Sequence, residues 1–439
     1  MKVCFYFDNR RKSNIDFSNP SNGNPGIGGT EYMIWTVSYY LNNMYDDIEV
    51  VMLAPIIGNL PKSIKSIKCC DEYEAVEIAK KINIDILVLR GAYYKKKDLY
   101  ELIDKYKINT VMWCHNFEEF EYLKLADECK YVKRNICVSR EQYDRLRDHS
   151  IFKKSIYIYN SLDFSIYSNV VSDGDKENIV CYLGAIRPKK GFDKLAEIWS
   201  KIEEAIPDAK LYVIGSGKLY NTNIKLGKYN IAEEEYENMF INHLIDDNGE
   251  IKNNIKFWGD LGHEEKLDVM SKSKVGIVNP VAKDETFCIS AIEFEALGIP
   301  VIAKKTFGLL NTVSNGKSGV LIKNDKELIN SIVELLKNKA LNKSMGQYGK
   351  RYVTSKFDIY SICDEWRKCL YEIKDDKKPC INLKTSNYLC DLKWLREINR
   401  LIKKFPIFNK LPAVAEYPDV IYSLGFYKKL NQIKEKLRI

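Results

Sequence analysis

The sequence of 439 residues has few of the features that mark membrane-spanning or metal-binding proteins. No stretch approaches the roughly 18 consecutive apolar residues of a membrane-spanning helix. Residues 1–13 form a short apolar segment followed directly by charged residues, so they lack the long apolar core and cleavage site of a secretory signal. Only 4 histidines are present, and they are far apart in the sequence. We therefore expect a cytoplasmic protein without a metal site.

The 12 cysteines form no Cys-x-x-Cys pair, which argues against a zinc site and against a redox motif. Several lie within apolar runs, among them Cys4, Cys114 and Cys137. Free cysteines are among the most buried residue types, so we expect reduced thiols in the core.

Charge is concentrated at the end of the chain, although the total is only +8. Residues 377–439 contain 14 Lys and Arg against 5 Asp and Glu, a difference of +9. The first 376 residues are therefore close to neutral. A nucleic-acid-binding protein would carry its basic surface on a folded domain. We expect no nucleic-acid partner, and we assign the positive charge to a tail.

Short apolar segments alternate with segments of helical period along most of the chain, which predicts α/β structure with parallel sheets covered on both faces. The pattern occurs as two sets, at residues 1–166 and 179–356, separated by a polar linker at residues 167–178. We predict two doubly wound, Rossmann-like domains facing across a cleft. In such sheets ligands bind beyond the carboxyl ends of the strands, so functional residues should follow strands.

The segment DETFCISAIEFEALGIPV, residues 284–301, carries acids within an apolar run. A helix is expected from residues 287–288 to Leu297, closed by Gly298. Glu285 then precedes the helix and Glu293 lies inside it. The N–H groups of the helix N-terminus between these acids, at residues 288–290, form an anion site. Two carboxylates that accept hydroxyl groups, flanking an anion site, suit a nucleotide sugar. The remaining acid, Glu295, is expected at the surface or between the domains.

Two further loops are candidates for binding anions. In GNPGIGGTEYMI, residues 23–34, the glycines allow backbone N–H groups to approach a phosphate or a negatively charged acceptor. Glu31 occupies the last glycine position of a dinucleotide-binding motif, which excludes that motif. In LGAIRPKKGFDKL, residues 183–195, Lys190 is placed to neutralise a diphosphate leaving group. The alternatives are a flexible turn for the first loop and a solvated basic turn for the second.

Other short motifs carry weaker signals. His115 ends an apolar strand and is expected at the mouth of the cleft, with a purely structural histidine as the alternative. The Gly-Lys-Ser of residues 315–321 is not a P-loop, because Asn311 replaces the required glycine and a strand follows. Residues 213–220 form a glycine-rich turn without a specific meaning. The Asp173 and Asp175 pair lies in the linker and is read as a solvated turn.

Taken together, these segments resemble the GT-B glycosyltransferases of the large retaining group marked by a Glu-x7-Glu motif, the glycosyl transferases group 1 or family 4-like enzymes. Residues 285–293 resemble that motif, with Gly298 and Pro300 in the expected register. The turn IYIYNSLD, residues 156–163, resembles the family's Asn-Gly-Val-Asp turn, and ICVSREQYDRL, residues 136–146, resembles the strand and helix before it. The resemblance covers about residues 1–372.

The resemblance implies roles for individual residues. Glu293 would bind the ribose hydroxyls and Glu285 the donor sugar. Lys190 matches the family's diphosphate-binding lysine, whereas Ala185 stands where the family has arginine; whether Arg187 replaces that arginine stays open. His115 would lie near the transferred sugar. The backbone of Phe287, Cys288, Ile289 and Ser290 would grip the diphosphate, and Gly28 and Gly29 would form the family's glycine-rich loop.

The implied activity is metal-independent transfer of a hexose, with retention, from a UDP- or GDP-linked donor. The acceptor would be a glycan or a lipid-linked hydroxyl, and the process would be the assembly of a surface polysaccharide or glycoconjugate. No cofactor is expected. Two alternatives are a non-catalytic nucleotide-sugar-binding subunit, which the alanine at position 185 favours, and a sugar-nucleotide epimerase of the same fold. Residues 357–376 are expected to form a helix that crosses back to the N-terminal domain.

Two regions depart from the family. Residues 231–244 predict an extra helix near the nucleotide side of the cleft. The tail, residues 377–439, includes the basic amphipathic segment LKWLREINRLIKKFPIFNKL at residues 392–411. Such a segment suits an anionic membrane surface, which would place the protein at the inner face of the plasma membrane. Packing on its own domains or on a partner subunit is the alternative.

Overall fold

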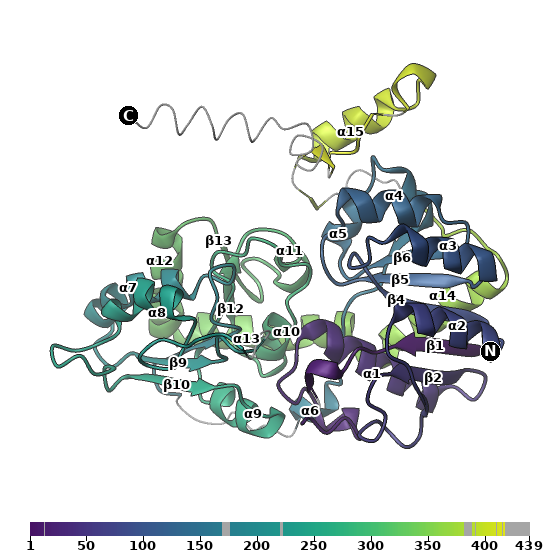
Figure 1. The fold of residues 1–439 in the computed structure, drawn as a ribbon. Coiled ribbons are helices and arrows are strands. Elements are labelled where there is room, and N and C mark those ends of the chain that lie inside the picture. Colours follow the sequence, from purple (N-terminus) through teal and green to yellow (C-terminus); the bar gives the residue numbers. More distant parts are fainter. Residues whose placement is uncertain are drawn as a thin grey trace, which may run out of the picture.

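The chain folds into two α/β domains that lie side by side, with a helical extension attached to the first (Figure 1). The computed structural model describes residues 1–12, 14–168, 176–219, 223–381, 389–390, 392–409, 411–414 and 416–417. Residues 169–175 of the predicted linker at 167–178, which include the Asp173 and Asp175 pair, lie outside these ranges. Tyr220, at the end of the glycine-rich turn of residues 213–220, also lies outside them.

The N-terminal domain is built on a parallel sheet of 7 strands in the order β3-β2-β1-β4-β5-β6-β7. Its strands are β1 (Lys2–Tyr6), β2 (Glu49–Ala54), β3 (Lys65–Lys68), β4 (Ile86–Gly91), β5 (Thr110–Cys114), β6 (Val132–Cys137) and β7 (Ser155–Tyr157). Its helices are α1 (Gly29–Met44), α2 (Glu72–Lys81), α3 (Lys97–Tyr106), α4 (Phe120–Glu128), α5 (Arg140–Asp144) and α6 (Ser165–Ser168), with 3-10 turns η1 (Arg10–Lys12), η2 (Pro20–Asn22) and η3 (Ser150–Lys154).

The C-terminal domain has a parallel sheet of 6 strands in the order β10-β9-β8-β11-β12-β13. Its strands are β8 (Ile179–Leu183), β9 (Lys210–Ile214), β10 (Ile255–Gly259), β11 (Val275–Val278), β12 (Val301–Lys304) and β13 (Gly319–Ile322). Its helices are α7 (Phe192–Ala205), α8 (Glu234–Phe240), α9 (His263–Ser271), α10 (Ile289–Ala296), α11 (Leu309–Thr312), α12 (Asp325–Lys337) and α13 (Lys339–Phe357), with a 3-10 turn η4 (Ile241–His243).

The sequence dictates this layered arrangement because the central strands are apolar on both faces. In β1, Val3 and Phe5 belong to one hydrophobic core, whereas Cys4 and Tyr6 belong to another on the opposite face of the sheet. A strand buried on both sides is what helices on both faces of a parallel sheet require. The predicted fold class is confirmed. The edge strands β3 and β7 were not predicted.

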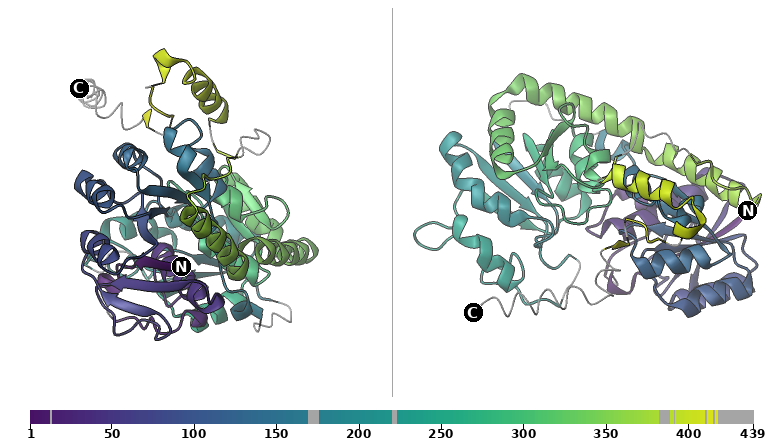
Figure 2. Two further views of the ribbon diagram at one scale, coloured as in Figure 1. Left: turned by 90° about the vertical axis from the view of Figure 1, so that its right-hand side faces the viewer. Right: turned by 90° about the horizontal axis from the view of Figure 1, so that it is seen from above.

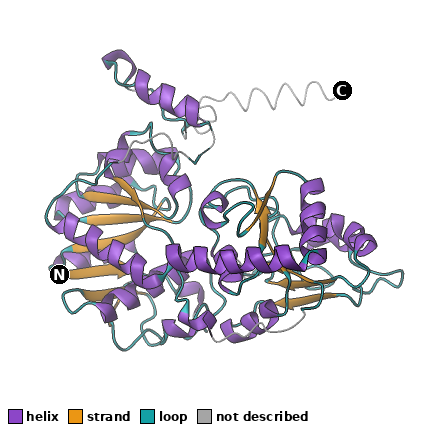
Figure 3. Cartoon of the chain, turned by 180° about the vertical axis from the view of Figure 1, so that it is seen from behind, coloured by secondary structure: helices purple, strands orange, loops and turns teal. Residues whose placement is uncertain are grey.

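Helix α14 (Ile359–Lys374) follows α13 and leaves the C-terminal domain to pack on the N-terminal one. Its residue Trp366 is fully buried, with ring centroids 6.0 Å from Phe5 and 4.6 Å from Trp113. Backbone hydrogen bonds between Leu162 and residues 357 and 359 add to the connection. Figures 2 and 3 show these long helices running across both domains, which fixes the position of one sheet relative to the other.

Helix α15 (Lys393–Ile402) and the turn η6 (Pro406–Phe408) project from the N-terminal domain beyond α4 and α5 (Figure 1). Within the described ranges, the length and apolar content of every helix fall short of what crossing a membrane requires. All 12 cysteines are free thiols, and all but Cys70 and Cys380 are buried.

Candidate active site

A cavity of about 410 Å³ lies between the two domains, at the carboxyl ends of both sheets. In the C-terminal sheet it adjoins β8 and β11, neighbouring strands whose chain connections run to opposite sides. That is the switch point at which doubly wound sheets bind ligands. Ten residues predicted from the sequence line the cavity, namely Gly29, His115, Arg187, Lys190, Glu285, Phe287, Cys288, Ile289, Ser290 and Glu293. Gly28 instead lines a second cavity of about 830 Å³, formed mainly by the N-terminal domain, with Leu219 and Asn223 of the C-terminal domain.

Glu285 lies in the loop between β11 and α10, where it meets a cation from the loop after β8. Its Oε2 is 2.6 Å from Lys190 Nζ and accepts a hydrogen bond of 2.5 Å from Asn279 Nδ2. The loop itself is closed by a hydrogen bond of 2.9 Å from the Gly308 N–H to the Glu285 carbonyl. The structure therefore holds one carboxylate and one ammonium group together at the floor of the cavity.

The N-terminus of α10 opens into the same cavity. Cys288 caps the helix in the left-handed region, with φ of 77°, and the first turn contains no acidic residue. Burial raises the pKa of the Cys288 thiol, so the thiol stays neutral at physiological pH. The positive end of the helix dipole is then available to an anion in the cavity.

Glu293 lies within α10 and is held by a buried cation. Its Oε1 is 2.5 Å from Lys266 Nζ and accepts a hydrogen bond of 3.1 Å from the Tyr167 hydroxyl. Lys266 was not predicted from the sequence, although its helix carries a signal. On α9 the residues His263, Lys266 and Met270 share the buried stripe, and a lysine on such a stripe requires a buried partner.

Three cations follow β8 at the edge of the cavity. Arg187, Lys189 and Lys190 all line it, and Lys189 Nζ is 2.6 Å from Asp284 Oδ2. The Lys190 N–H donates a hydrogen bond of 2.9 Å to the Arg187 carbonyl, which closes the turn. Ala185 is buried beside them. The structure thus keeps an arginine at the cavity, two residues after the alanine.

His115 follows β5 and is buried against the cavity. Burial, and secondarily the Arg90 guanidinium, lowers the pKa of the imidazole to about 3, so the ring is neutral at physiological pH. Among the described residues its Nε2 has no hydrogen-bond partner, and the same is true of Asn160 Oδ1, which also lines the cavity. The His115 carbonyl accepts a hydrogen bond of 2.6 Å from Thr286 Oγ1. These polar atoms suit a polar ligand such as a sugar.

Two predictions were wrong. Glu295 is fully buried inside the C-terminal domain, neither at a surface nor between the domains, and its Oε1 accepts a hydrogen bond of 2.6 Å from Ser318 Oγ. Burial raises the pKa of this carboxyl well above its usual range. The extra helix within residues 231–244 is α8, but it packs on α7 through Tyr236 and contributes no described residue to the cavity lining. In the connection between β9 and α8, Leu219 does line the cavity.

This chain is similar to known glycosyltransferases in sequence and in fold. Residues 164–352 match the family of glycosyl transferases group 1. An uncharacterized glycosyltransferase of Methanocaldococcus jannaschii is 27% identical over 357 residues, which is 78% of this chain and 88% of that protein. A capsular polysaccharide biosynthesis glycosyltransferase, CapM of Staphylococcus aureus, is 26% identical over 43% of this chain and 44% of its own length. The structure of HepE from Anabaena in complex with UDP-glucose covers 85% of this chain and 100% of its own, with a TM-score of 0.59 at 15% identity.

Proposed function

We propose a reaction for this chain on the premise that it belongs to the group 1 glycosyltransferases of GT-B fold. The reaction is the metal-independent transfer of a hexose from a nucleotide-diphosphate sugar, UDP- or GDP-linked, to a hydroxyl group, with retention of anomeric configuration. The observation that carries the proposal is the grouping of Glu285, Glu293 and Lys190 around the N-terminus of α10 in one cavity. The acceptor is a glycan or a lipid-linked hydroxyl, in the assembly of a surface polysaccharide or glycoconjugate.

The comparisons support the choice of substrates. The structure of HepE contains UDP-glucose, and CapM is described as a capsular polysaccharide biosynthesis enzyme. The cavity in this chain offers matching chemistry, with carboxylates for hydroxyl groups and a cationic side for phosphates. Backbone N–H groups and lysine bind any diphosphate, whichever base and sugar it carries. The selection of the base and of the sugar therefore depends on other residues of the cavity.

The cations act on the leaving group. As the bond between the anomeric carbon and the diphosphate oxygen breaks, its electron pair passes to the nucleoside diphosphate. Lys190, Arg187 and the N-terminus of α10 stabilise that developing charge, since all three line the cavity. Lys190 Nζ contacts Glu285 Oε2 at 2.6 Å, so this ammonium group lies beside the carboxylate proposed to bind the sugar.

The acceptor hydroxyl attacks the anomeric carbon from the face that the diphosphate leaves, and its proton passes to the departing phosphate oxygen. Glu285 orients the sugar through its hydroxyl groups, and Glu293 holds the ribose. Neutral His115 offers an imidazole nitrogen to the transferred sugar. No charge is needed on that ring, which agrees with the burial that lowers its pKa.

The test is a pair of substitutions with different expected signatures. Glu285→Gln lowers turnover by on the order of 10² to 10³, because it removes a charged contact that positions the reacting sugar. Glu293→Ala chiefly weakens donor binding. Asp284→Asn, next to Glu285 but paired with Lys189 at the cavity edge, serves as the control and retains turnover. Thermal shift with UDP-, GDP- and ADP-sugars selects the donor, and transfer and hydrolysis are then measured. Near-wild-type rates in both glutamate variants contradict the proposal.

A second candidate, a non-catalytic nucleotide-sugar-binding subunit, is favoured by Ala185 in place of the family's arginine. Donor hydrolysis without acceptor separates the two: the enzyme releases nucleoside diphosphate slowly, and that release disappears in Glu285→Gln. Binding without any release supports the subunit. For an active enzyme, the anomeric configuration of the product, read by NMR, tests retention.

A further inference from the structure

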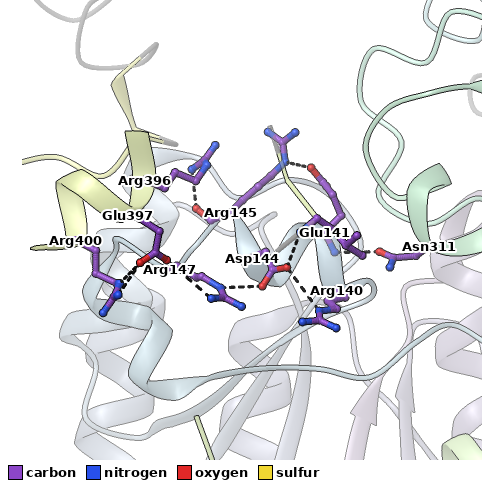
Figure 4. A network of polar contacts seen from close by, with 10 residues as sticks. Arg140, Glu141, Asp144, Arg145, Arg147, Asn311, Arg396, Glu397 and Arg400 are labelled. Atoms are coloured by element: carbon purple, nitrogen blue, oxygen red, sulfur yellow. Dashed lines mark hydrogen bonds and ion pairs between the residues drawn. The ribbon is translucent and has the colours of Figure 1, made fainter. Parts of the chain in front are cut away.

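Helix α15 attaches to the N-terminal domain by its polar side (Figure 4). Arg396 and Asn399 are its buried residues. Arg396 Nη1 donates a hydrogen bond of 2.7 Å to the Arg145 carbonyl, and Asn399 Nδ2 donates one of 2.8 Å to Asp148 Oδ2. An amphipathic helix on a soluble domain ordinarily buries its apolar stripe instead. Helix α15 therefore buries its polar side on the domain and leaves its apolar side exposed.

A network of ion pairs fixes the helix in this orientation. Arg147 contacts Asp144 of α5 at 2.9 Å and Glu397 of α15 at 3.9 Å. Arg400 in turn holds the Glu397 carboxylate at 2.6 Å. Lys403 Nζ donates a hydrogen bond of 2.8 Å to the Asp148 carbonyl. Rolling the helix to bury its apolar side would break the two of these contacts that cross to the domain, those of Glu397 with Arg147 and of Lys403 with Asp148.

The opposite side of the extension presents large apolar side chains to solvent. Trp394 is 63% exposed and Ile407 is 88% exposed. Ile398, Leu401, Phe405 and Phe408 continue the same surface, and all are exposed. Within α15, Trp394, Ile398 and Leu401 are spaced four and three apart, which keeps them on one side of the helix. Phe405, Ile407 and Phe408 add exposed apolar side chains directly after it. We call residues 394, 398, 401, 405, 407 and 408 the apolar face. Contiguous apolar surface of this kind marks an interaction site.

Exposed cations accompany the apolar face and identify its partner. Lys393 and Lys404 are exposed beside it, and the sequence from residue 377 onward carries a net charge of +9. Aromatic and aliphatic residues flanked by lysine are the composition of helices that lie in the surface of an anionic bilayer. Two copies of the chain meeting symmetrically through this face would place the same lysines against each other, which is unfavourable.

We propose that the apolar face of α15 and η6 inserts into the surface of a bilayer containing anionic lipids and anchors the protein there peripherally. The aromatic side chains enter the boundary between headgroups and acyl chains, while the lysines contact lipid phosphates. The polar side of the helix stays on the N-terminal domain, as the structure shows it. This proposal uses the tail alone and holds for any donor sugar or acceptor.

The experiment is co-sedimentation of the 439-residue chain with vesicles. Vesicles of phosphatidylglycerol and phosphatidylcholine in equal parts are compared with vesicles of phosphatidylcholine alone. The unaltered chain binds the first and not the second. The double variant Phe405→Ser and Ile407→Ser weakens binding by at least about tenfold, because two large apolar side chains leave the bilayer. The matched control, Ile57→Ser with Met239→Ser, changes exposed residues elsewhere, at 41% and 63% exposure, and leaves binding unchanged.

A second variant separates the charge contribution from the apolar one. Lys393→Glu with Lys404→Glu leaves the apolar face intact, weakens binding to the anionic vesicles and makes the remaining binding less sensitive to salt. Circular dichroism and thermal unfolding confirm that each variant is folded. Equal binding by the unaltered chain and the Phe405 and Ile407 variant overturns the proposal. A second outcome also overturns it: neither protein binds vesicles, and sedimentation shows that the unaltered chain is a dimer whereas the Phe405 and Ile407 variant is a monomer. The apolar face would then bind a second copy of the chain.

Discussion

Removing the cation that holds Glu293 should destabilise the C-terminal domain more than removing any surface lysine. Lys266 Nζ lies 2.5 Å from Glu293 Oε1, and the two side chains are only 8% and 4% exposed. The substitution Lys266→Met preserves the length of the side chain and most of its apolar contacts. It leaves a buried carboxylate without its counter-ion, and the Tyr167 hydroxyl as its one remaining partner among the described contacts.

The expected cost follows from the burial of the pair. Breaking a buried ion pair from one side costs about 3–5 kcal/mol, because the remaining charge is left uncompensated. The hydrogen bond from Tyr167 stays in place, so we expect the lower end, about 3 kcal/mol. For a domain of this size each kcal/mol corresponds to about 2–4 °C, which gives a fall in Tm of about 6–12 °C.

The assay is scanning calorimetry together with urea unfolding of the ligand-free protein. Lys272→Met is the matched control, because Lys272 follows the same helix and is 2.6 Å from Asp268, but in a pair whose side chains are 52% and 65% exposed. We expect it to cost less than about 1 kcal/mol. Adding Glu293→Gln to Lys266→Met should recover part of the loss. Equal urea midpoints for Lys266→Met and Lys272→Met would refute the reasoning.

Two further substitutions test the surroundings of the cavity. Gly308→Ala should lower both the urea midpoint and the donor affinity. A Cβ there would lie 2.1 Å from the Thr286 carbonyl oxygen and would displace the loop that carries Glu285. Gly58→Ala is the control, because a Cβ there has no neighbour within 4 Å, and it should leave the urea midpoint and the affinity unchanged. Glu295→Gln should gain stability relative to the unaltered chain as pH rises above about 4.5, the ordinary value for this group. The reason is that burial raises the pKa of Glu295 in the folded state, so only the unfolded chain releases the proton in this range. The measurement is urea unfolding of both proteins over a pH series. A difference in unfolding free energy that stays constant with pH would contradict the prediction.

Most strands could be predicted because their residues are largely apolar. They include β10 and β13, which lie at the two edges of the C-terminal sheet. The strand β3, with sequence Lys-Ser-Ile-Lys, lies at a sheet edge and has one apolar residue in four. β7 has three residues and lies at the other edge. These two strands are too polar or too short to carry the apolar pattern that identifies the others.

The candidate site was predictable where a residue's role depends on its place after a strand. Lys190 and Glu285 follow β8 and β11, and those strands adjoin at the switch point, so the sequence position determines the spatial position. Partners across the fold were not predictable in this way. The hydrogen bond of Ser318 to Glu295 joins the loop before β13 to α10, and nothing local to Glu295 indicates it.

The short helix α5 of the N-terminal domain contacts both the tail helix α15 and the C-terminal domain. On one side its Asp144 contacts Arg147, which reaches Glu397 of α15. On the other side the N–H of Glu141 donates a hydrogen bond of 3.0 Å to Asn311 Oδ1 in the C-terminal domain. The guanidinium of Arg145, just after α5, lies over the adjoining rings of Phe117 and Phe307, 4.8 and 4.9 Å from their centroids. Phe307 immediately precedes Gly308, whose N–H closes the Glu285 loop. A bilayer that holds α15 would therefore hold the cleft at a defined orientation, because contacts run without a break from Glu397 through Arg147 and α5 to Phe307, beside the Glu285 loop.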